Sequence, residues 1–262
     1  MNSGGAIFAE SMLTVTNCTF TNNQAKNYGG AIVTLSESKI SNSIFKANKA
    51  VFGGAITSAD KLTLTNCKFN NNQVKTYGGA IYHERNNLIV TKSTFIKNQA
   101  STGGAIDTVS DFFNKIRIKD STFKNNKAGF SGAINCLIST ISGCTFINNK
   151  ATDTSAINFK SDLTVFNCNF TNNKANNIGG AISGGYDDSS LTVNKCTFTN
   201  NKAVFGAGAI VNGAKKIKIT NSKFKNNLLG KNHFLSVLNQ GGKLTKKNVA
   251  ITPKEGTKIK KK

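Results

Sequence analysis

Several features that mark common classes of protein are missing from this sequence of 262 residues. No run approaches the roughly 18 consecutive apolar residues of a membrane-crossing helix, which predicts a chain without a transmembrane segment. The first residues lack the basic and apolar regions of a secretory signal peptide. No segment of the repeat region carries a sustained apolar period of about 3.6 residues, so a sizeable helix is not expected.

Acidic residues and arginine are scarce as well. The chain has 12 Asp and Glu against 34 Lys and Arg, a formal net charge of +22, and its only arginines are Arg85 and Arg117. Such an excess attracts anionic partners, whether acidic glycan, lipid or nucleic acid. Lysine without arginine, and without exposed aromatics at a regular spacing, reads bases poorly, so sequence-specific binding of nucleic acid is not expected.

Metal-binding motifs are absent too. The six cysteines include no Cys-x-x-Cys pair, and His83 and His233 are isolated, so neither a metal site nor a cofactor is expected. Five cysteines share one position of the repeat described below: Cys18, Cys67, Cys144, Cys168 and Cys196. We interpret them as free buried thiols that serve as small apolar fillers. Contact among the last three, which fall in consecutive repeats, is the alternative.

What the sequence does contain is a repeat built from two alternating motifs. The isoleucine of Gly-Gly-Ala-Ile, or of a close variant, falls at residues 7, 32, 56, 81, 106, 134, 157, 182 and 210. The phenylalanine of Phe-x-x-Asn falls at residues 20, 45, 69, 95, 123, 146, 170, 198 and 224. The spacing of 23 to 28 residues is typical of units that stack into a solenoid.

Within each repeat, the pattern between the motifs indicates strands. The segment from Leu13 to Phe20 alternates apolar and polar residues, which is the period of a half-buried strand. Short strands separated by Asn, Gly and Ser turns predict an all-β fold. We expect a right-handed single-stranded parallel β-helix, a solenoid of about nine coils with three short strands per coil.

Stacking of the coils predicts interior columns of equivalent residues. The phenylalanines form an aromatic stack, the isoleucines an aliphatic column, and the Cys or Ser two residues before each phenylalanine a column of small side chains. The asparagine of Phe-x-x-Asn turns inward into an amide ladder, in which each side chain bonds its neighbour and a turn carbonyl. The glycine pair suits a place where the chain passes closely or φ is positive.

The pattern also predicts how the chain is divided. The β-helix repeats occupy residues 1–227, a C-terminal cap occupies residues 228–251, and residues 252–262 form a basic flexible tail. The chain begins inside a repeat, so a fragment of a longer surface passenger protein is one interpretation.

Gly-Gly-Ala-Ile alternating with Phe-x-x-Asn resembles the repeat signature of the chlamydial polymorphic outer membrane proteins. It is equally similar to the adhesin-like right-handed β-helix proteins of methanogenic archaea. The resemblance covers residues 4 to about 227. It implies a surface-exposed or secreted region that mediates adhesion, so we expect the protein at the cell surface or outside the cell.

The most specific surface feature is a set of lysines after Phe-x-x-Asn. Lys127, Lys150, Lys174 and Lys202 occupy equivalent positions, expected in a turn, in four successive coils, and Lys49 belongs to the same set. Like charges at this spacing repel by about 1 kcal/mol per pair in water, and a partner with spaced negative charges relieves that repulsion. The hypothesis is an acidic polysaccharide or another cell-surface component as partner. The alternative is a solvated face that keeps the rod in solution.

Catalysis is the competing function, because right-handed β-helices include polysaccharide lyases and hydrolases. Such enzymes need clustered acids or acids beside a basic residue. The best local concentration is Asp107, Asp111, Arg117 and Asp120, yet no two acids fall at equivalent positions of adjacent coils. A non-catalytic adhesin-like protein is therefore expected, with a carbohydrate-active β-helix enzyme as the alternative.

Overall fold

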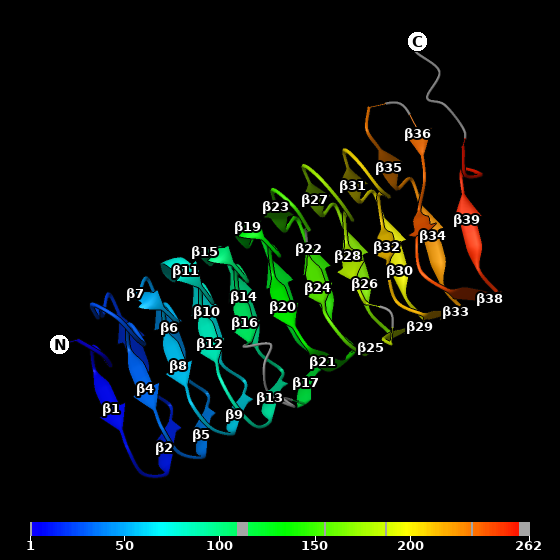
Figure 1. Ribbon diagram of the computed structural model, residues 1–262. Coiled ribbons are helices and arrows are strands. Elements are labelled where there is room, and N and C mark those ends of the chain that lie inside the picture. Colours follow the sequence, from blue (N-terminus) through cyan, green and yellow to red (C-terminus); the bar gives the residue numbers. More distant parts are fainter. Residues whose placement is uncertain (1, 109–114, 155, 187, 232, 257–262) are drawn as a thin grey trace.

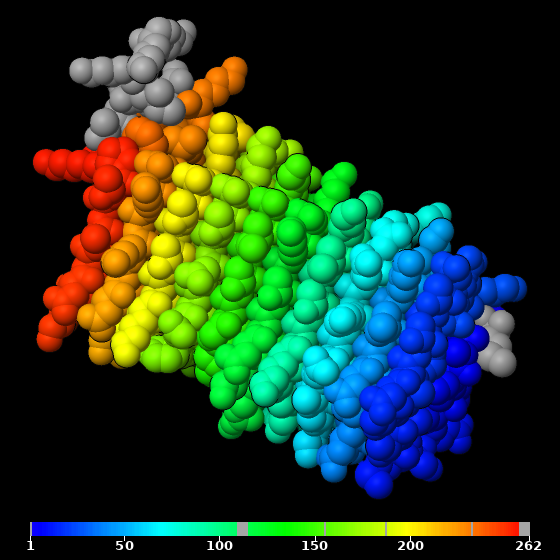
Figure 2. Space-filling view, turned by 180° about the vertical axis from the view of Figure 1, so that it is seen from behind, coloured from blue at the N-terminus to red at the C-terminus, as the bar shows by residue number. Residues whose placement is uncertain are grey.

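The computed structural model describes residues 2–108, 115–154, 156–186, 188–231 and 233–256. These residues form a rod in which the chain winds as a right-handed parallel β-helix of about nine coils (Figure 1). Seen from behind, the coils are parallel bands that follow sequence order along the rod (Figure 2). The predicted fold class is confirmed. The three predicted strands per coil are present, and a fourth strand follows them in most coils.

The first sheet carries the isoleucines of Gly-Gly-Ala-Ile in register, as in the pairing of Ile81 with Ile56 and Ile106. Its strands are β1 (Ile7–Ala9), β4 (Ile32–Thr34), β8 (Ile56–Ser58), β12 (Ile81–His83), β16 (Ile106–Thr108), β20 (Ile134–Cys136), β24 (Ile157–Phe159), β28 (Ile182–Gly184), β32 (Ile210–Asn212) and β37 (Val237–Asn239).

The second sheet comes from the alternating segments and lies along the lower edge of the rod in Figure 1. Its strands are β2 (Leu13–Thr16), β5 (Ser38–Ser41), β9 (Leu62–Thr65), β13 (Leu88–Thr91), β17 (Lys115–Lys119), β21 (Ile138–Ser142), β25 (Leu163–Phe166), β29 (Ser190–Asn194), β33 (Lys216–Thr220) and β38 (Lys243–Lys247).

The third sheet carries the phenylalanines. Its strands are β3 (Thr19–Thr21), β6 (Ile44–Lys46), β10 (Lys68–Asn70), β14 (Thr94–Ile96), β18 (Thr122–Lys124), β22 (Thr145–Ile147), β26 (Asn169–Thr171), β30 (Thr197–Thr199), β34 (Lys223–Lys225) and β39 (Ala250–Thr252).

The fourth sheet follows the inward asparagines and lies along the upper edge of the rod in Figure 1. Its parallel strands are β7 (Lys49–Phe52), β11 (Gln73–Tyr77), β15 (Gln99–Thr102), β19 (Lys127–Phe130), β23 (Lys150–Ala151), β27 (Lys174–Ala175), β31 (Lys202–Ala203) and β35 (Leu228–Leu229). A last strand, β36 (His233–Phe234), pairs with β35 in the antiparallel sense.

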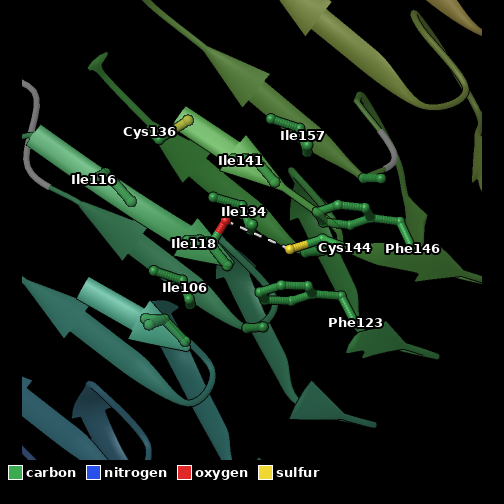
Figure 3. Close-up of a cluster of buried hydrophobic side chains, with 14 of the residues drawn as sticks. Ile106, Ile116, Ile118, Phe123, Ile134, Cys136, Ile141, Cys144, Phe146 and Ile157 are labelled. Atoms are coloured by element: carbon green, nitrogen blue, oxygen red, sulfur yellow. Dashed lines mark hydrogen bonds between the residues drawn. The ribbon is translucent and has the colours of Figure 1, made fainter. Parts of the chain in front are cut away.

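The predicted aromatic stack fills the core beneath the third sheet. Nine phenylalanines from Phe20 to Phe224 stack in eight successive pairs, with ring centroids 4.7 to 4.9 Å apart and planes within 7° of parallel. Figure 3 shows Phe123 and Phe146 in this stack, together with the isoleucines that pack in the same core. The stack and the aliphatic columns give the rod one continuous hydrophobic core.

The predicted amide ladder is also confirmed. Asn126 represents its rungs: its Nδ2 donates to Asn149 Oδ1 of the next coil at 3.1 Å and to the Phe95 carbonyl of the preceding coil at 3.0 Å. Its Oδ1 accepts both the backbone N–H and the Nδ2 of Asn98, at 2.9 and 3.0 Å. Each buried amide therefore satisfies two backbone groups of the preceding coil and bonds the side-chain amide of the next, which explains why asparagine stands here instead of an apolar residue.

A second set of asparagines explains the frequent Asn-Asn pairs. The residue before each inward asparagine has a positive φ, for example 57° at Asn125 and 54° at Asn148. Asparagine tolerates this left-handed conformation better than most residues. Ala47 and Lys97 occupy the same position with φ values of 55°. One asparagine of each pair thus turns the chain, and the other bonds the interior.

The two glycines of Gly-Gly-Ala-Ile have different roles. The first has a positive φ, as at Gly103 with 61°. The second lies against the neighbouring coil: a Cβ on Gly104 would meet the Gly132 carbonyl oxygen at 2.2 Å. Both explanations expected for the pair therefore apply, one to each glycine.

Ser131 departs from this pattern and offers a test of it. It replaces the first glycine, keeps a φ of 58°, and has a buried Oγ with no hydrogen-bond partner. We expect Ser131→Gly to raise the free energy of unfolding by about 1 kcal/mol, because it removes a strained Cβ and an unsatisfied hydroxyl. Denaturant titration measures the change.

The reverse change one coil earlier, Gly103→Ser, is the matched control. A Cβ there would meet the Ile106 carbonyl oxygen at 2.4 Å, so this variant should lose stability. A stabilising Gly103→Ser, or a destabilising Ser131→Gly, contradicts the role assigned to the position.

The column of small residues has a function that size alone did not predict. After the first coil, the Oγ or Sγ of these side chains accepts a backbone N–H from the preceding coil, as Ser93 Oγ accepts from Cys67 at 3.1 Å and Cys168 Sγ from Cys144 at 3.3 Å. The six cysteines are free, and five are buried. The expectation that Cys18 is buried is wrong. Thiols further along contact a carbonyl of the preceding coil, whereas Cys18 lies in the first coil and its thiol contacts the Thr16 carbonyl of the same coil.

The segment predicted to cap the rod adds a further layer. Strands β37, β38 and β39 extend the first three sheets, while β36 folds back on β35. Glu255, in the predicted tail, accepts the backbone N–H groups of Ser236 and Val237 through Oε1, at 3.3 and 3.2 Å. Residues 257–262 lie outside the described residues, and the predicted domain boundaries stay predictions.

Candidate functional site

The candidate lysines occupy one column of the fourth sheet. Lys127 pairs with Lys150, Lys150 with Lys174, and Lys174 with Lys202 in successive parallel strands. We call these four residues the lysine run. Toward the N-terminus the same column continues with Gln99, Gln73, Lys49 and Gln24. The sequence therefore placed all five lysines in one column correctly.

The local structure of the lysine run differs from the expected turn. Each of its lysines is the first residue of a strand, because its backbone N–H donates to the carbonyl of the inward asparagine of the preceding coil, as Lys127 does to Asn98 at 3.0 Å. The strand spacing of about 4.8 Å in parallel sheets thus fixes the spacing of the ammonium groups' attachment points. Three of the four side chains are exposed, and that of Lys202 is half-buried.

The column borders two hollows on the fourth sheet. The C-terminal hollow, of about 240 Å³, is lined by Lys127, Ala128, Lys150, Ala151, Thr152, Lys174 and Asn176. The N-terminal hollow, of about 450 Å³, is lined by Gln24, Ala25, Lys49, Ala50, Val51, Gln73, Val74, Lys75 and Gln99. Ala128 and Ala151 line the C-terminal hollow beside its lysines, whereas Val74 takes the position of Ala50 in the N-terminal hollow. The register pairing of Gln99 with Lys127 makes the two hollows neighbours along the rod.

Among the residues that the structure describes, no carboxylate forms an ion pair with the lysine run. In the described part of the chain, the ion pairs of lysine involve Lys61, Lys119, Lys215 and Lys246, none of which belongs to the column. Four ammonium groups thus share one short stretch of surface without a protein counter-ion. The repulsion among these ammonium groups favours an elongated anionic ligand, which can reach several of them, over a compact one.

Aromatic side chains stack at the ends of the strands that line the N-terminal hollow, outside its lining. Tyr28, Phe52 and Tyr77 stack with centroids 4.9 and 5.8 Å apart, and Tyr82 tilts against Phe52 at 5.3 Å. We call these four residues the aromatic wall. Tyr28 is 37% exposed and Tyr77 43% exposed, so the expectation that no exposed aromatics recur at a regular spacing is wrong. A signal was present, because an aromatic residue directly precedes three successive glycine pairs.

The acids proposed for the enzymatic alternative are not brought together among the described residues. Asp107 points outward from the first sheet between Tyr82 and Asn135, Arg117 is exposed on the second sheet, and Asp120 is exposed before the third. Asp111 lies outside the described residues. The described members of the predicted concentration therefore do not share one groove.

Asp107 is nevertheless an unusual carboxyl group. It is 4% exposed, and burial raises its pKa to about 7, although a hydrogen bond from Asn135 Nδ2 at 3.3 Å and the charge of Lys160 oppose the shift. Asn158 in turn donates to Asn135 at 3.0 Å, so the carboxyl group ends a short polar ladder. A raised pKa marks many catalytic acids, but buried structural carboxyl groups share it.

The remaining candidates for metal or cofactor chemistry, His83 and Cys136, do not form a common site. Burial lowers the pKa of His83 to about 4, and its Nε2 lies 3.3 Å from the Asn86 carbonyl oxygen. Burial also raises the pKa of Cys136 to about 12. Within the described ranges, no group of three or more His, Cys, Asp or Glu side chains is placed to hold a metal ion.

Comparison with known proteins agrees with this architecture. A family described as the right handed beta helix region matches residues 4–159. The chain belongs to this family. Searches of the curated proteins and of the solved structures gave no match. Among the described residues, no helix is long and apolar enough to cross a membrane.

Proposed function

We propose that the protein is a non-catalytic, adhesin-like rod of the cell surface or the extracellular space that binds anionic polysaccharides along the fourth sheet. The observation that carries the proposal is the lysine run: four lysines in register, in successive strands, beside a hollow and without protein counter-ions. A linear polymer that lies along the rod axis meets one lysine per coil, whereas a compact anion meets one or two.

The repeat resemblance supports the biological setting of the proposal. Gly-Gly-Ala-Ile alternating with Phe-x-x-Asn is shared with polymorphic outer membrane proteins and with archaeal adhesin-like proteins, both of which present β-helices outside the cell. The match of residues 4–159 to the right-handed β-helix family supports the fold that these proteins have in common. Protease accessibility of the protein on intact producing cells tests the location, and full protection inside the cell would contradict it.

Replacement of the whole lysine run tests the binding surface. The variant carrying Lys127→Gln, Lys150→Gln, Lys174→Gln and Lys202→Gln should bind polygalacturonate at least about thirtyfold more weakly at low salt, if each contact contributes about 0.5 kcal/mol. The decrease of affinity with rising salt should also become shallower, because fewer charge contacts remain to be screened. Titration calorimetry at several salt concentrations measures both effects.

A second quadruple variant is the matched control. Lys39, Lys46, Lys68 and Lys124 are exposed lysines of the second and third sheets, and their replacement by Gln removes the same net charge. This control should keep most of the affinity. Equal losses in the two variants would show that net charge, rather than the column, attracts the polymer.

Enzymatic action on the polysaccharide is the second candidate, favoured by the buried Asp107 with its raised pKa. Under the proposal, incubation with polygalacturonate releases neither reducing ends nor unsaturated sugars. Turnover that is lost in Asp107→Asn would overturn the non-catalytic function and establish the alternative.

A further inference from the structure

The polar column changes its chemistry halfway along the rod. From Lys127 to Lys202 it presents ammonium groups only, whereas the N-terminal hollow is lined by Gln24, Gln73 and Gln99 together with Lys49 and Lys75. An ammonium group only donates hydrogen bonds, while a glutamine amide both donates and accepts them. Sugar hydroxyls also donate and accept. The two halves of the column therefore suit different parts of a glycan.

The N-terminal hollow differs from its neighbour in two further respects. Its volume of about 450 Å³ is nearly twice the 240 Å³ of the C-terminal hollow. The aromatic wall stands at the end of the same strands, since Val51 of the hollow directly precedes Phe52, and Tyr77 ends the strand that begins with Gln73. Tyrosine combines an apolar ring with a hydroxyl tip, a combination found at many recognition surfaces.

We propose that the N-terminal hollow is a second glycan subsite, which holds uncharged sugar units of the polymer whose acidic units lie on the lysine run. Gln73 and Gln99 pair with sugar hydroxyls, and the aromatic wall lies next to the hollow, at the ends of its strands and outside its lining. This inference deepens the proposed function and depends on it for the nature of the ligand. It predicts selection for polymers that contain neutral and acidic sugars together.

The chain supplies its own spectroscopic reporter for this subsite. It has no tryptophan and four tyrosines, of which Tyr28, Tyr77 and Tyr82 belong to the aromatic wall. Because Val51 of the hollow directly precedes Phe52 of the aromatic wall, we expect tyrosine emission to respond more to a ligand in the N-terminal hollow than to one confined to the lysine run.

The experiment compares two polymers on the full chain. Polygalacturonate carries a carboxylate on every sugar, and in gellan uncharged sugars separate the uronic acids. We expect gellan to change tyrosine emission and to retain affinity at salt concentrations that release polygalacturonate. The double variant Gln73→Ala with Gln99→Ala should bind gellan about tenfold more weakly, because it loses hydrogen bonds of roughly 0.5–1.5 kcal/mol each. Its affinity for polygalacturonate should stay within about twofold of the wild type.

Controls separate the failure of this inference from that of the proposed function. The variant Asn70→Ala with Gln240→Ala removes two amides from other surfaces and should behave as the wild type. If the glutamine variant and this control bind gellan equally, or if gellan leaves tyrosine emission unchanged, the second subsite is refuted while lysine-dependent binding of polygalacturonate still stands. If neither polymer binds the wild type, both proposals fall.

Discussion

Asn126→Asp is expected to lower the free energy of unfolding by about 3–5 kcal/mol at neutral pH, the range for an uncompensated charge in a protein interior. The side chain is fully buried, and its Nδ2 donates to Phe95 O and Asn149 Oδ1. Aspartate has the same shape but places an oxygen opposite these two acceptors. Three oxygens then face one another without a hydrogen between them, so the ladder is broken on one side of the rung.

The pH dependence of this loss identifies its cause. Burial and facing acceptors raise the pKa of a carboxyl group above its ordinary value of about 3.9, while the unfolded chain keeps that value. The unfolded state therefore loses its proton first, and stability falls as pH rises through about 4. Below that range the protonated group regains one donor, so the loss should be smallest there. Urea titrations between pH 3 and pH 8 measure the trend.

The first rung of the ladder supplies a matched control. Asn23 is only half-buried, and among the described residues its Nδ2 donates to Asn48 Oδ1 alone. Asn23→Asp should cost about 1 kcal/mol, because its carboxylate reaches solvent and fewer bonds are lost. Similar losses at Asn23 and Asn126, or a loss at Asn126 that is independent of pH, would contradict the account of the ladder.

The interior of the rod was largely predictable because it depends on single residues at fixed offsets. Phe20 and its equivalents stack as expected, and the asparagine three residues later forms the ladder. In a parallel β-helix, one period of the sequence corresponds to one coil. Residues at the same position of successive repeats therefore contact one another. A sequence repeat this regular therefore predicts which side chains touch, even without coordinates.

The fourth sheet was not predicted, because several of its strands are too short to show a period and the longer ones, such as β7 and β15, do not alternate apolar and polar residues regularly. β23, β27 and β31 contain two residues each, and alternation needs at least four or so. The two hollows were not predicted either, because they lie on the fourth sheet. The sequence does place an alanine after each lysine of the lysine run. These alanines indicate the C-terminal hollow only once the residues are known to share a sheet.

The aromatic wall shows a second limit of sequence analysis. Tyr77 and Phe52 are register partners, but the pairing shifts between Val74 and Tyr77, so the distance from the inward asparagine varies from coil to coil. Counting from the asparagine therefore misses the column. Counting back from the glycine pair finds it, because the close approach at the second glycine fixes that point of every coil.

Removal of one ring from the middle of the phenylalanine stack should also have a large effect. Phe123 is fully buried between Phe95 and Phe146, with centroids 4.8 and 4.9 Å away. Phe123→Ala should lower the free energy of unfolding by about 3–5 kcal/mol, the usual range for a large cavity in a packed core. Figure 3 shows that the core around Phe123 is built from side chains of several sheets, which limits how far it can collapse into the gap.

The effect of removing a ring should depend on its position along the rod. Phe20 stacks on Phe45 alone and is 9% exposed, so Phe20→Ala should cost less than half as much as Phe123→Ala. In a solenoid each coil contacts only its neighbours, and a central defect weakens the coupling between the two halves. Phe123→Ala should therefore broaden the unfolding transition or divide it in two, whereas Phe20→Ala leaves it sharp. Equal losses with unchanged transition widths would mean that the stack does not couple the coils, and that the backbone ladders alone transmit cooperativity along the rod.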